Sequence, residues 1–292
     1  MKYISDKQIS LFDFIMQKLN LGSNSKGKKI IKYSKILING KIVNNQKYII
    51  ESGDEIILER EKSKVINTNS RSPILYEDNF LIIAKKPAGI LSYGTGEDKF
   101  RSFYGNISTL INEESKRKIQ LFLVHRLDRE VMGLIIFAKS EEIQNQLKDN
   151  WKNVEKLYYA LVEKKPEKES GTIESWLRDH NDKLTVISGI QTPDSKHAIT
   201  HYRFIKQVGD YSLLEVKLET GRKNQIRVHM ADIGCPIVGD YRYGADKKYK
   251  RQVRLCAYSL NFPHPKTGKQ VSCKIDLTRT FLHPANNDEK YK

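Results

Sequence analysis

The residues best suited to chemistry lie in the polar segment His125–Glu130, which reads His-Arg-Leu-Asp-Arg-Glu. Asp128 lies between Arg126 and Arg129, and positive charge beside a carboxyl group favours its ionised form. An ionised, partly desolvated aspartate in a cleft is a candidate nucleophile. The structural alternative is an Asp–Arg pair that closes a turn and takes no part in chemistry.

Short apolar runs flank this segment on both sides, at residues 121–124 and from Val131 to Ala138. Runs of this length and composition predict buried strands. The polar segment is therefore expected in a tight connection at the edge of a core.

Arg227 is the second candidate, within a segment that predicts a helix ending at Gly234. It lies beside the apolar face of that helix, so its guanidinium is expected to be half-buried and to need an anion. Asp128 is the expected partner, and a surface arginine is the alternative. The apolar face consists of Ile226, Met230 and Ile233.

Tyr158 is the third candidate and lies in a predicted strand over residues 156–162. An aromatic ring in a basic cleft can stack on an extruded base, and a phenol can assist proton transfer. Core packing is the ordinary role of a tyrosine in a strand and stays an alternative.

The composition predicts a polyanionic partner. The 292 residues carry 51 Lys and Arg against 35 Asp and Glu, a net charge of +16, which favours RNA. Three separated cysteines and seven histidines without ligand spacing predict no disulfide framework and no metal site. The chain starts without an apolar signal core, so we expect a cytoplasmic protein.

The first 60 residues predict a small unit of their own. A helix after a cap at Ser5-Asp6, a second helix over 26–33, a hairpin turning at Asn39-Gly40 and a strand over 55–58 are expected. Seven lysines and no acid lie between Gly22 and Lys47, which predicts a phosphate-binding stripe, with a solvated surface as the alternative. The lysines assigned to RNA binding are Lys26, Lys28, Lys29, Lys32, Lys35 and Lys41.

The rest of the chain predicts an α+β catalytic domain. A polar linker over 61–72 precedes a domain over 73–292, whose many strands and few helices indicate a mixed, mainly antiparallel sheet. The sequence has neither a glycine-rich dinucleotide fingerprint nor a P-loop, so no nucleotide cofactor is expected. Predicted helices are 107–118 and 141–154, and predicted strands are 74–78, 80–84, 172–178, 184–187, 198–208 and 211–219.

Four separated motifs resemble the RluA-type pseudouridine synthases. They are Lys85–Gly89, His125–Lys139, Lys156–Val162 and the long segment from Thr220 through Gly244, and Phe262–Pro265 also matches. The chain departs from the family pattern where Val131-Met132 replaces Thr-Ser, Lys223-Asn224 replaces Thr-His, and Cys235 and Cys256 replace His. The N-terminal unit resembles the S4-like RNA-binding domain, with a divergent start to its second helix.

The resemblance implies that uridines in RNA are isomerised to pseudouridine without a cofactor or metal. It implies that Asp128 is catalytic, that Arg227 pairs with it, and that Tyr158 supports the flipped base. Arg126 would fill the gap left by that nucleotide, and Arg222 is a further expected RNA contact. Ribosomal RNA is the favoured substrate and transfer RNA the alternative.

Two other functions stay open. One is a non-catalytic RNA-binding or ribosome-assembly protein with the same fold, which the convergence of Asp128, Tyr158 and Arg227 in one pocket would disfavour. The other is a carboxylate-based glycoside hydrolase, which needs a second acid opposite Asp128. Glu130 lies too close in the chain to supply that second acid.

Overall fold

The structure of the chain is a computed structural model. It contains two compact units, which are described separately. The described residues are 2–33, 35–59, 73–94, 101–114, 118–180, 186–247 and 252–284. The predicted linker over 61–72 lies outside them, so the division into domains 1–60 and 73–292 stays a prediction.

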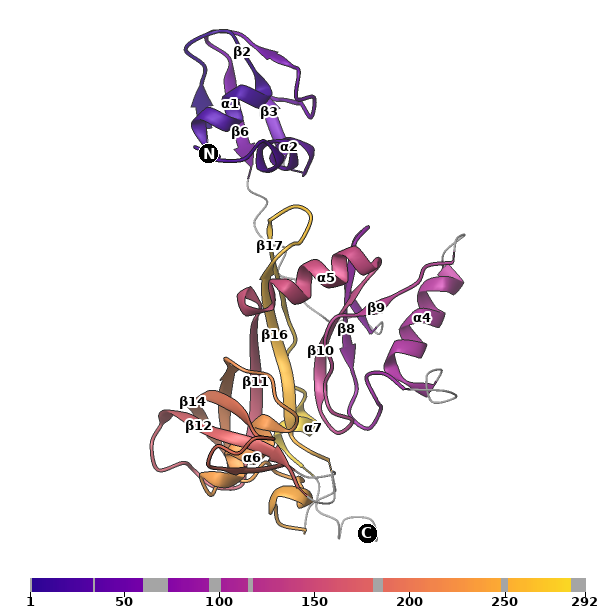
Figure 1. Cartoon of the computed structure of the whole chain (residues 1–292), viewed down its shortest axis with the longest axis vertical. Helices are drawn as coiled ribbons and strands as arrows, with labels where there is room; N and C mark the ends of the chain where they lie inside the picture. Colours follow the sequence, from indigo (N-terminus) through magenta and orange to yellow (C-terminus); the bar gives the residue numbers. More distant parts are fainter. Residues whose placement is uncertain are drawn as a thin grey trace. The chain divides into compact units, whose positions relative to one another are not determined.

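The N-terminal unit packs two helices and a small sheet around an apolar core of Leu11, Phe14, Ile15, Ile36 and Ile56. Figure 1 shows both helices beside the sheet. The helices are α1 (Leu11–Lys18) and α2 (Asn24–Tyr33). The strands of the sheet, in spatial order, are β1 (Lys2–Ile4), β6 (Glu55–Glu59), β3 (Lys35–Ile38) and β4 (Lys41–Ile42). A separate pair is formed by β2 (Ile9–Ser10) and β5 (Ile49–Ile50).

Two local predictions for this unit have different outcomes. The turn at Asn39-Gly40 is confirmed, with φ of 49° and 79°, the two positive angles that this tight hairpin requires. The predicted cap at Ser5-Asp6 is wrong, because Ser10 caps α1 by accepting a hydrogen bond from the Asp13 amide at 3.1 Å. Ser5 is buried and donates its hydroxyl to the Lys7 carbonyl instead.

The second unit is built on an eleven-stranded, mainly antiparallel sheet, which confirms the predicted α+β class (Figure 1). Its main path runs β13-β12-β14-β15-β11-β16-β10-β8-β7, with β17 on β16 and β9 on β10. The strands are β7 (Ile74–Glu77), β8 (Leu81–Lys86), β9 (Phe122–Leu123), β10 (Met132–Ala138), β11 (Glu155–Val162), β12 (Ser170–Asp179), β13 (Val186–Gly189), β14 (Lys196–Val208), β15 (Tyr211–Leu218), β16 (Leu255–Pro263) and β17 (Gln270–Lys274).

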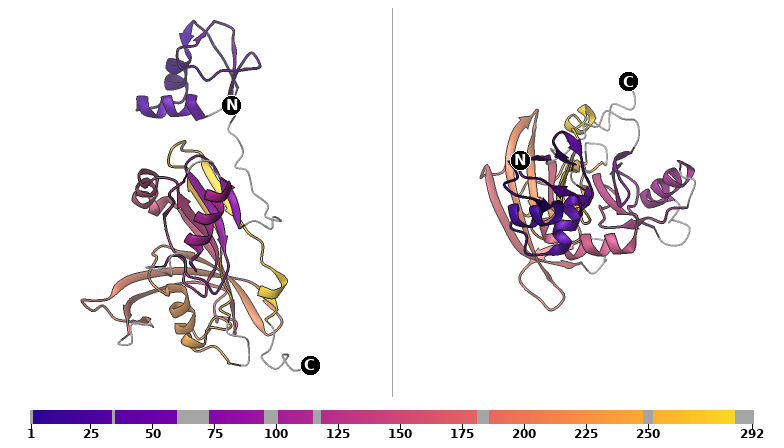
Figure 2. Two further views of the ribbon diagram at one scale, coloured as in Figure 1. Left: turned by 90° about the vertical axis from the view of Figure 1, so that its right-hand side faces the viewer. Right: turned by 90° about the horizontal axis from the view of Figure 1, so that it is seen from above.

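Figure 2 shows the helices of this unit from two further directions. They are α4 (Phe103–Glu114), α5 (Glu141–Asp149), α6 (Gln225–Asp232) and the short α7 (Arg279–Leu282). Helix α4 begins four residues before its predicted start at Ile107, because the Ser102 hydroxyl accepts a hydrogen bond from the Gly105 amide. Apolar side chains of α4 join Phe137 of β10 in the main core.

Strands β10 and β16 join the two halves of the sheet as a parallel pair. Gly133 has a φ of 130°, and a Cβ atom there would lie 2.4 Å from the Ala257 carbonyl oxygen, so only glycine fits. Met132 and Cys256, two departures from the family pattern, are register partners in this pair. Two apolar side chains thus stand together where the family pattern has Ser and His.

No helix in the described part of the chain is long and apolar enough to cross a membrane.

Candidate active site

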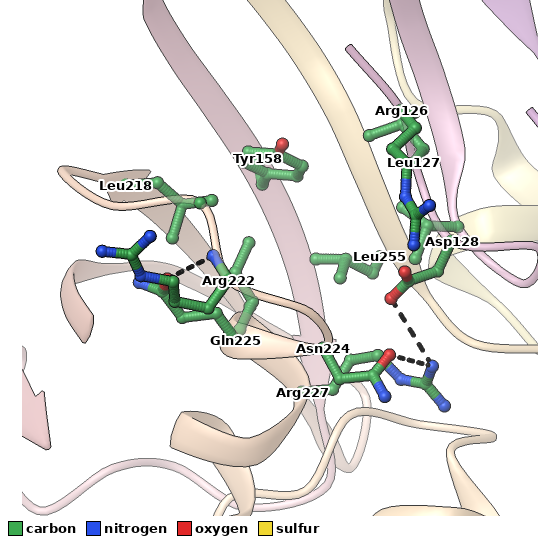
Figure 3. A pocket seen from close by; sticks show the side chains of 13 residues that line it. Arg126, Leu127, Asp128, Tyr158, Leu218, Arg222, Asn224, Gln225, Arg227 and Leu255 are labelled. Atoms are coloured by element: carbon green, nitrogen blue, oxygen red, sulfur yellow. Dashed lines mark hydrogen bonds and ion pairs between the residues drawn. The ribbon is translucent and has the colours of Figure 1, made fainter. Parts of the chain in front are cut away.

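One pocket in the second unit brings the three predicted catalytic residues together (Figure 3). Asp128 comes from the connection between β9 and β10, Tyr158 from β11 and Arg227 from α6. Elements far apart in the sequence therefore meet around a single space. The other lining residues are Arg126, Leu127, Val131, Leu218, Gly221, Arg222, Asn224, Gln225, Ile226 and Leu255.

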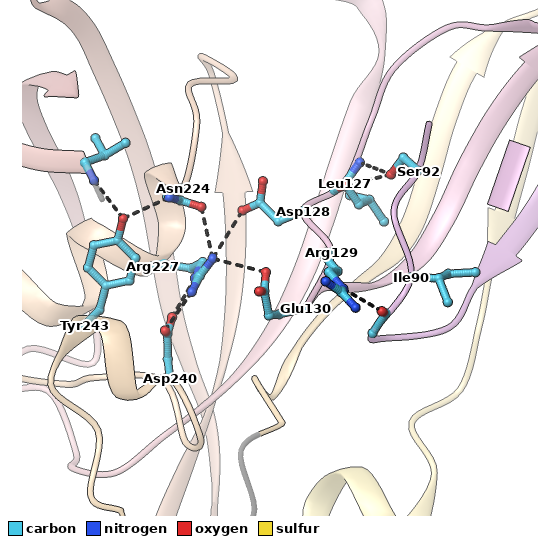
Figure 4. A network of polar contacts seen from close by, with 12 residues as sticks. Ile90, Ser92, Leu127, Asp128, Arg129, Glu130, Asn224, Arg227, Asp240 and Tyr243 are labelled. Carbon is cyan, nitrogen blue, oxygen red and sulfur yellow. Dashed lines mark hydrogen bonds and ion pairs between the residues drawn. The ribbon is translucent and has the colours of Figure 1, made fainter. Parts of the chain in front are cut away.

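The connection that carries Asp128 is held by a second loop, which follows β8. The buried Ser92 hydroxyl donates to the Leu127 carbonyl at 2.6 Å and accepts from the Leu127 amide at 3.0 Å. Gly89 and Arg129 exchange two further hydrogen bonds, of 2.7 and 2.9 Å (Figure 4). Residues on both sides of Asp128 are thereby fixed.

Lys86, at the end of β8, reinforces the same arrangement. Its side chain is fully buried, and Nζ donates to the carbonyls of Pro87 and Ile90 at 2.9 Å and of Arg129 at 3.2 Å. Burial lowers the pKa of Lys86 to about 8, while the nearby Asp128 and Glu130 oppose that shift. The sequence placed the Lys85–Gly89 motif beside the site but gave no role to this lysine.

His125 is a structural member of the segment. Its Nε2 accepts a hydrogen bond from the Ile136 amide of β10 at 3.2 Å, and its ring packs on Trp151 with 5.0 Å between centroids. Burial, together with the neighbouring Lys156, lowers the pKa of His125 to about 3. The imidazole is therefore neutral at physiological pH and unsuited to act as an acid.

Arg227 does form an ion pair with Asp128, but Asp128 is not its main partner. The closest partner of Arg227 is Asp240, which accepts from Nε at 2.6 Å and from Nη2 at 2.8 Å, whereas Asp128 Oδ2 lies 3.7 Å from Nη1 (Figure 4). Arg227 and Asp240 are 3% and 1% exposed, so this is a buried bidentate ion pair. The prediction also understated the burial of Arg227, because α6 packs on the sheet on this side.

Three side chains that the sequence did not single out complete the support of Arg227. Asn224 adopts the left-handed conformation at φ 53° and accepts from Arg227 Nη1 at 3.0 Å, while its Nδ2 donates to the Tyr243 hydroxyl. Tyr243 places its ring 5.0 Å from the guanidinium carbon. Gln225 accepts from the Arg222 amide and donates to the Ile199 carbonyl and the Thr200 hydroxyl, which fixes the start of α6.

The carboxyl group of Asp128 is in a less polar environment than expected. Desolvation by burial raises its pKa, Glu130 adds to that rise, and Arg227 and Arg126 oppose it. The arginines were expected to dominate, but the loss of water outweighs them. A carboxylate with raised proton affinity is a better nucleophile and base than one in water.

Tyr158 contributes an almost fully buried phenol. Its side chain is 8% exposed, and burial beside Asp128 raises its pKa. The group therefore stays protonated at neutral pH and is a weak base. Its ring and hydroxyl are available to the pocket.

RNA binding by the predicted basic residues stays a prediction, and the structure describes the side chains of four of them. Arg126 and Arg222 are exposed and line the pocket, and Arg222 Nε donates to the His197 carbonyl at 2.9 Å. Lys28 and Lys41 are exposed in the N-terminal unit, whereas the side chains of Lys26, Lys29, Lys32 and Lys35 lie outside what the structure describes. Among the residues that it does describe, no cluster of His, Cys, Asp or Glu could hold a metal ion.

Comparisons with known proteins assign both parts of the chain. Residues 80–232 match the family model described as RNA pseudouridylate synthase, and residues 11–56 match the S4 domain. The human protein RNA Pseudouridylate Synthase Domain Containing 4 has the same fold, with a TM-score of 0.60 and 23% identity over 72% of this chain and 90% of that chain.

Two bacterial relatives match nearly the whole length. An uncharacterised RNA pseudouridine synthase, YlyB of Bacillus subtilis, is 30% identical over 95% of this chain and 93% of the relative. Ribosomal large subunit pseudouridine synthase C of Buchnera aphidicola is 34% identical over 87% of this chain and 85% of the relative. The chain therefore belongs to the RluA-type RNA pseudouridine synthases, isomerases that convert uridine to pseudouridine in RNA.

Proposed function

We propose that this protein isomerises specific uridines in structured ribosomal RNA, with Asp128 as the catalytic group. The convergence of Asp128, Tyr158 and Arg227 on one pocket carries this proposal. A protein that only binds RNA has no need of a partly desolvated carboxylate with raised proton affinity beside a buried arginine.

In the proposed reaction the target uridine is flipped into the pocket, because a base in a helix is inaccessible. The bond between C1′ and N1 breaks, the base rotates, and C5 bonds to C1′. C5 then loses its proton and N1 gains one, so that substrate and product are isomers. Asp128 attacks or stabilises the reacting sugar or base during cleavage.

Tyr158 and Arg227 support this step from either side of the pocket. Tyr158 supports the base and donates a hydrogen bond from its protonated phenol. Because the phenol already carries its proton at neutral pH, it does not accept one from the ribose. Arg227 holds positive charge beside Asp128 and orients it. The exposed Arg126 fills the space that the flipped nucleotide leaves in the RNA.

Ribosomal RNA is the preferred substrate in this proposal for two reasons. Relatives across most of the chain carry the name ribosomal large subunit pseudouridine synthase C. The exposed Lys28 and Lys41 of the N-terminal unit fit an RNA with extended structure around the target. Transfer RNA is the alternative, and the cytoplasm is the expected location for either substrate.

The test is pseudouridine mapping of ribosomal and transfer RNA from cells that lack the protein, complemented with the native chain or with Asp128→Asn. We expect one or a few ribosomal sites that the native chain restores and Asp128→Asn does not, while the variant still binds the same RNA. Glu174→Gln, which removes a surface carboxylate paired with His197, serves as the control and should restore every site.

A site restored by Asp128→Asn would exclude this residue as the catalytic group. Dependence of a transfer RNA site alone would replace the ribosomal substrate. If no site in either RNA depended on the protein, the non-catalytic RNA-binding function would take the place of the enzyme.

A further inference from the structure

Arg227 has one nitrogen that its closest partner leaves available. Nε and Nη2 both donate to Asp240, which fixes the plane and direction of the guanidinium. Nη1 donates to Asn224 Oδ1 at 3.0 Å and faces the connection between β9 and β10. Nη1 is therefore the nitrogen of Arg227 that lies nearest the connection between β9 and β10, which we call the Asp128 loop.

Two carboxylates of that loop share Nη1 at nearly equal distances (Figure 4). Asp128 Oδ2 lies 3.7 Å from it and Glu130 Oε2 lies 3.6 Å from it, both beyond the range of a charge-assisted hydrogen bond. Asp128 lines the pocket, whereas Glu130 is not among the lining residues. Glu130 therefore competes for the arginine from outside the space that the substrate enters.

The other charged and titratable groups around Asp128 do not take over the role of Glu130 in sharing Nη1 of Arg227. Arg126 is exposed, so solvent weakens its effect, and Lys86 Nζ is fixed on three backbone carbonyls. The phenol of Tyr158 is neutral. Among the described residues, three acids lie within 4 Å of the Arg227 guanidinium: Asp240, Asp128 and Glu130. Glu130 is thus the acid that can compete with Asp128 for Nη1.

We propose that Glu130 is a positioning residue which, by sharing Nη1 of Arg227, holds Asp128 in a loose ion pair and leaves its carboxylate available to the nucleotide. This inference rests on the proposed role of Asp128. A tight hydrogen-bonded pair would stabilise the resting carboxylate and would have to be broken before the carboxylate could act on the substrate. The loose ion pair still orients the Asp128 carboxylate, and less free energy is needed to separate it from Arg227.

The experiment compares Glu130→Gln with the native chain and with the surface variant Glu174→Gln. Glutamine keeps the shape of the side chain and removes its charge, so Nη1 should close on Asp128. The substrate is ribosomal RNA from cells that lack the protein. The single-turnover rate of pseudouridine formation is measured from pH 5 to pH 9, with thermal unfolding of each variant alongside.

We expect Glu130→Gln to slow isomerisation by about tenfold at neutral pH, while RNA affinity and melting temperature stay near the native values. Removing a negative neighbour also favours the ionised form of Asp128, so the acidic limb of the rate profile should move to lower pH. A purely structural role would not move that limb.

A native rate and native pH profile in Glu130→Gln, with Asp128→Asn inactive, would overturn this inference and leave the proposed function standing. A slower variant with an unmoved acidic limb and a lower melting temperature would also overturn it, because Glu130 would then act only through folding. Full activity of Asp128→Asn would instead remove the proposed role of Asp128 itself.

Discussion

At the scale of single residues, Arg227 determines the electrostatics of the site. It is one buried cation among three carboxylates, and only Asp240 is bonded to it at close range. The pairing raises the pKa of Arg227 further, so the guanidinium is charged at every physiological pH. Asp240 thus fixes the position of the guanidinium, and Asp128 and Glu130 interact with it at longer distance.

Asp240→Asn should destabilise the fold and impair activity together. Removing one partner of a buried pair costs about 3 to 5 kcal/mol, although Asp128 and Glu130 can partly replace it, so we expect a loss of about 3 kcal/mol in the free energy of unfolding. Denaturant unfolding measures this loss. Asp276→Asn, at an exposed carboxylate, is the control and should stay within about 0.5 kcal/mol of the native chain. An equally stable Asp240→Asn would contradict the central place given to this pair.

At the scale of elements, the parallel junction of β10 and β16 positions both sides of the pocket. Asp128 lies four residues before β10, and Leu255 opens β16. The backbones approach so closely at Gly133 that no side chain fits. The relative position of Asp128 and Leu255, which both line the pocket, therefore depends on this contact.

Gly133→Ala should consequently separate these strands. The added Cβ meets the Ala257 backbone, and the positive φ adds strain of about 1 to 3 kcal/mol, so we expect a total loss of at least 2 kcal/mol in the free energy of unfolding. Gly189→Ala is the matched control, since nothing lies within 4 Å of its added Cβ. Chemical denaturation of both variants would reveal the difference, and equal stabilities would contradict a close strand junction.

At the scale of the whole molecule, the net charge of +16 is distributed over both units. The catalytic unit presents Arg126 and Arg222 at the pocket, and the N-terminal unit presents Lys28 and Lys41 on its surface. We propose that the first pair acts on the target nucleotide and that the second pair supplies affinity for phosphates around it.

Lys28→Ala combined with Lys41→Ala should therefore weaken RNA binding without slowing the chemical step. If each lysine contacts one phosphate, the plot of log affinity against log salt should lose about 0.7 to 0.9 of slope per lysine. Titration of ribosomal RNA at several salt concentrations measures this slope. Lys2→Ala with Lys7→Ala removes the same charge outside the stripe, and an equal effect there would indicate only a general loss of positive charge.

Local signals account for the parts of the fold that the sequence predicted well. The apolar runs on both sides of His125–Glu130 are strands β9 and β10, and Asn39-Gly40 makes the hairpin turn. Gly234, at φ 71°, follows the end of α6 as expected. The start of α1 was less predictable, because both Ser5 and Ser10 precede it and only the packed structure shows that Ser10 is the cap.

Residue types at fixed spacing were enough to predict the family, the α+β class and the three side chains that line the pocket. How charge is shared among these side chains follows only from the packing of the folded chain. Asp240 lies 13 residues after Arg227, and the path of the chain between them gives no sequence signal for a bidentate pair. The raised pKa of Asp128 likewise depends on burial, which arises only when the 125–130 segment, β11 and α6 pack around the same space.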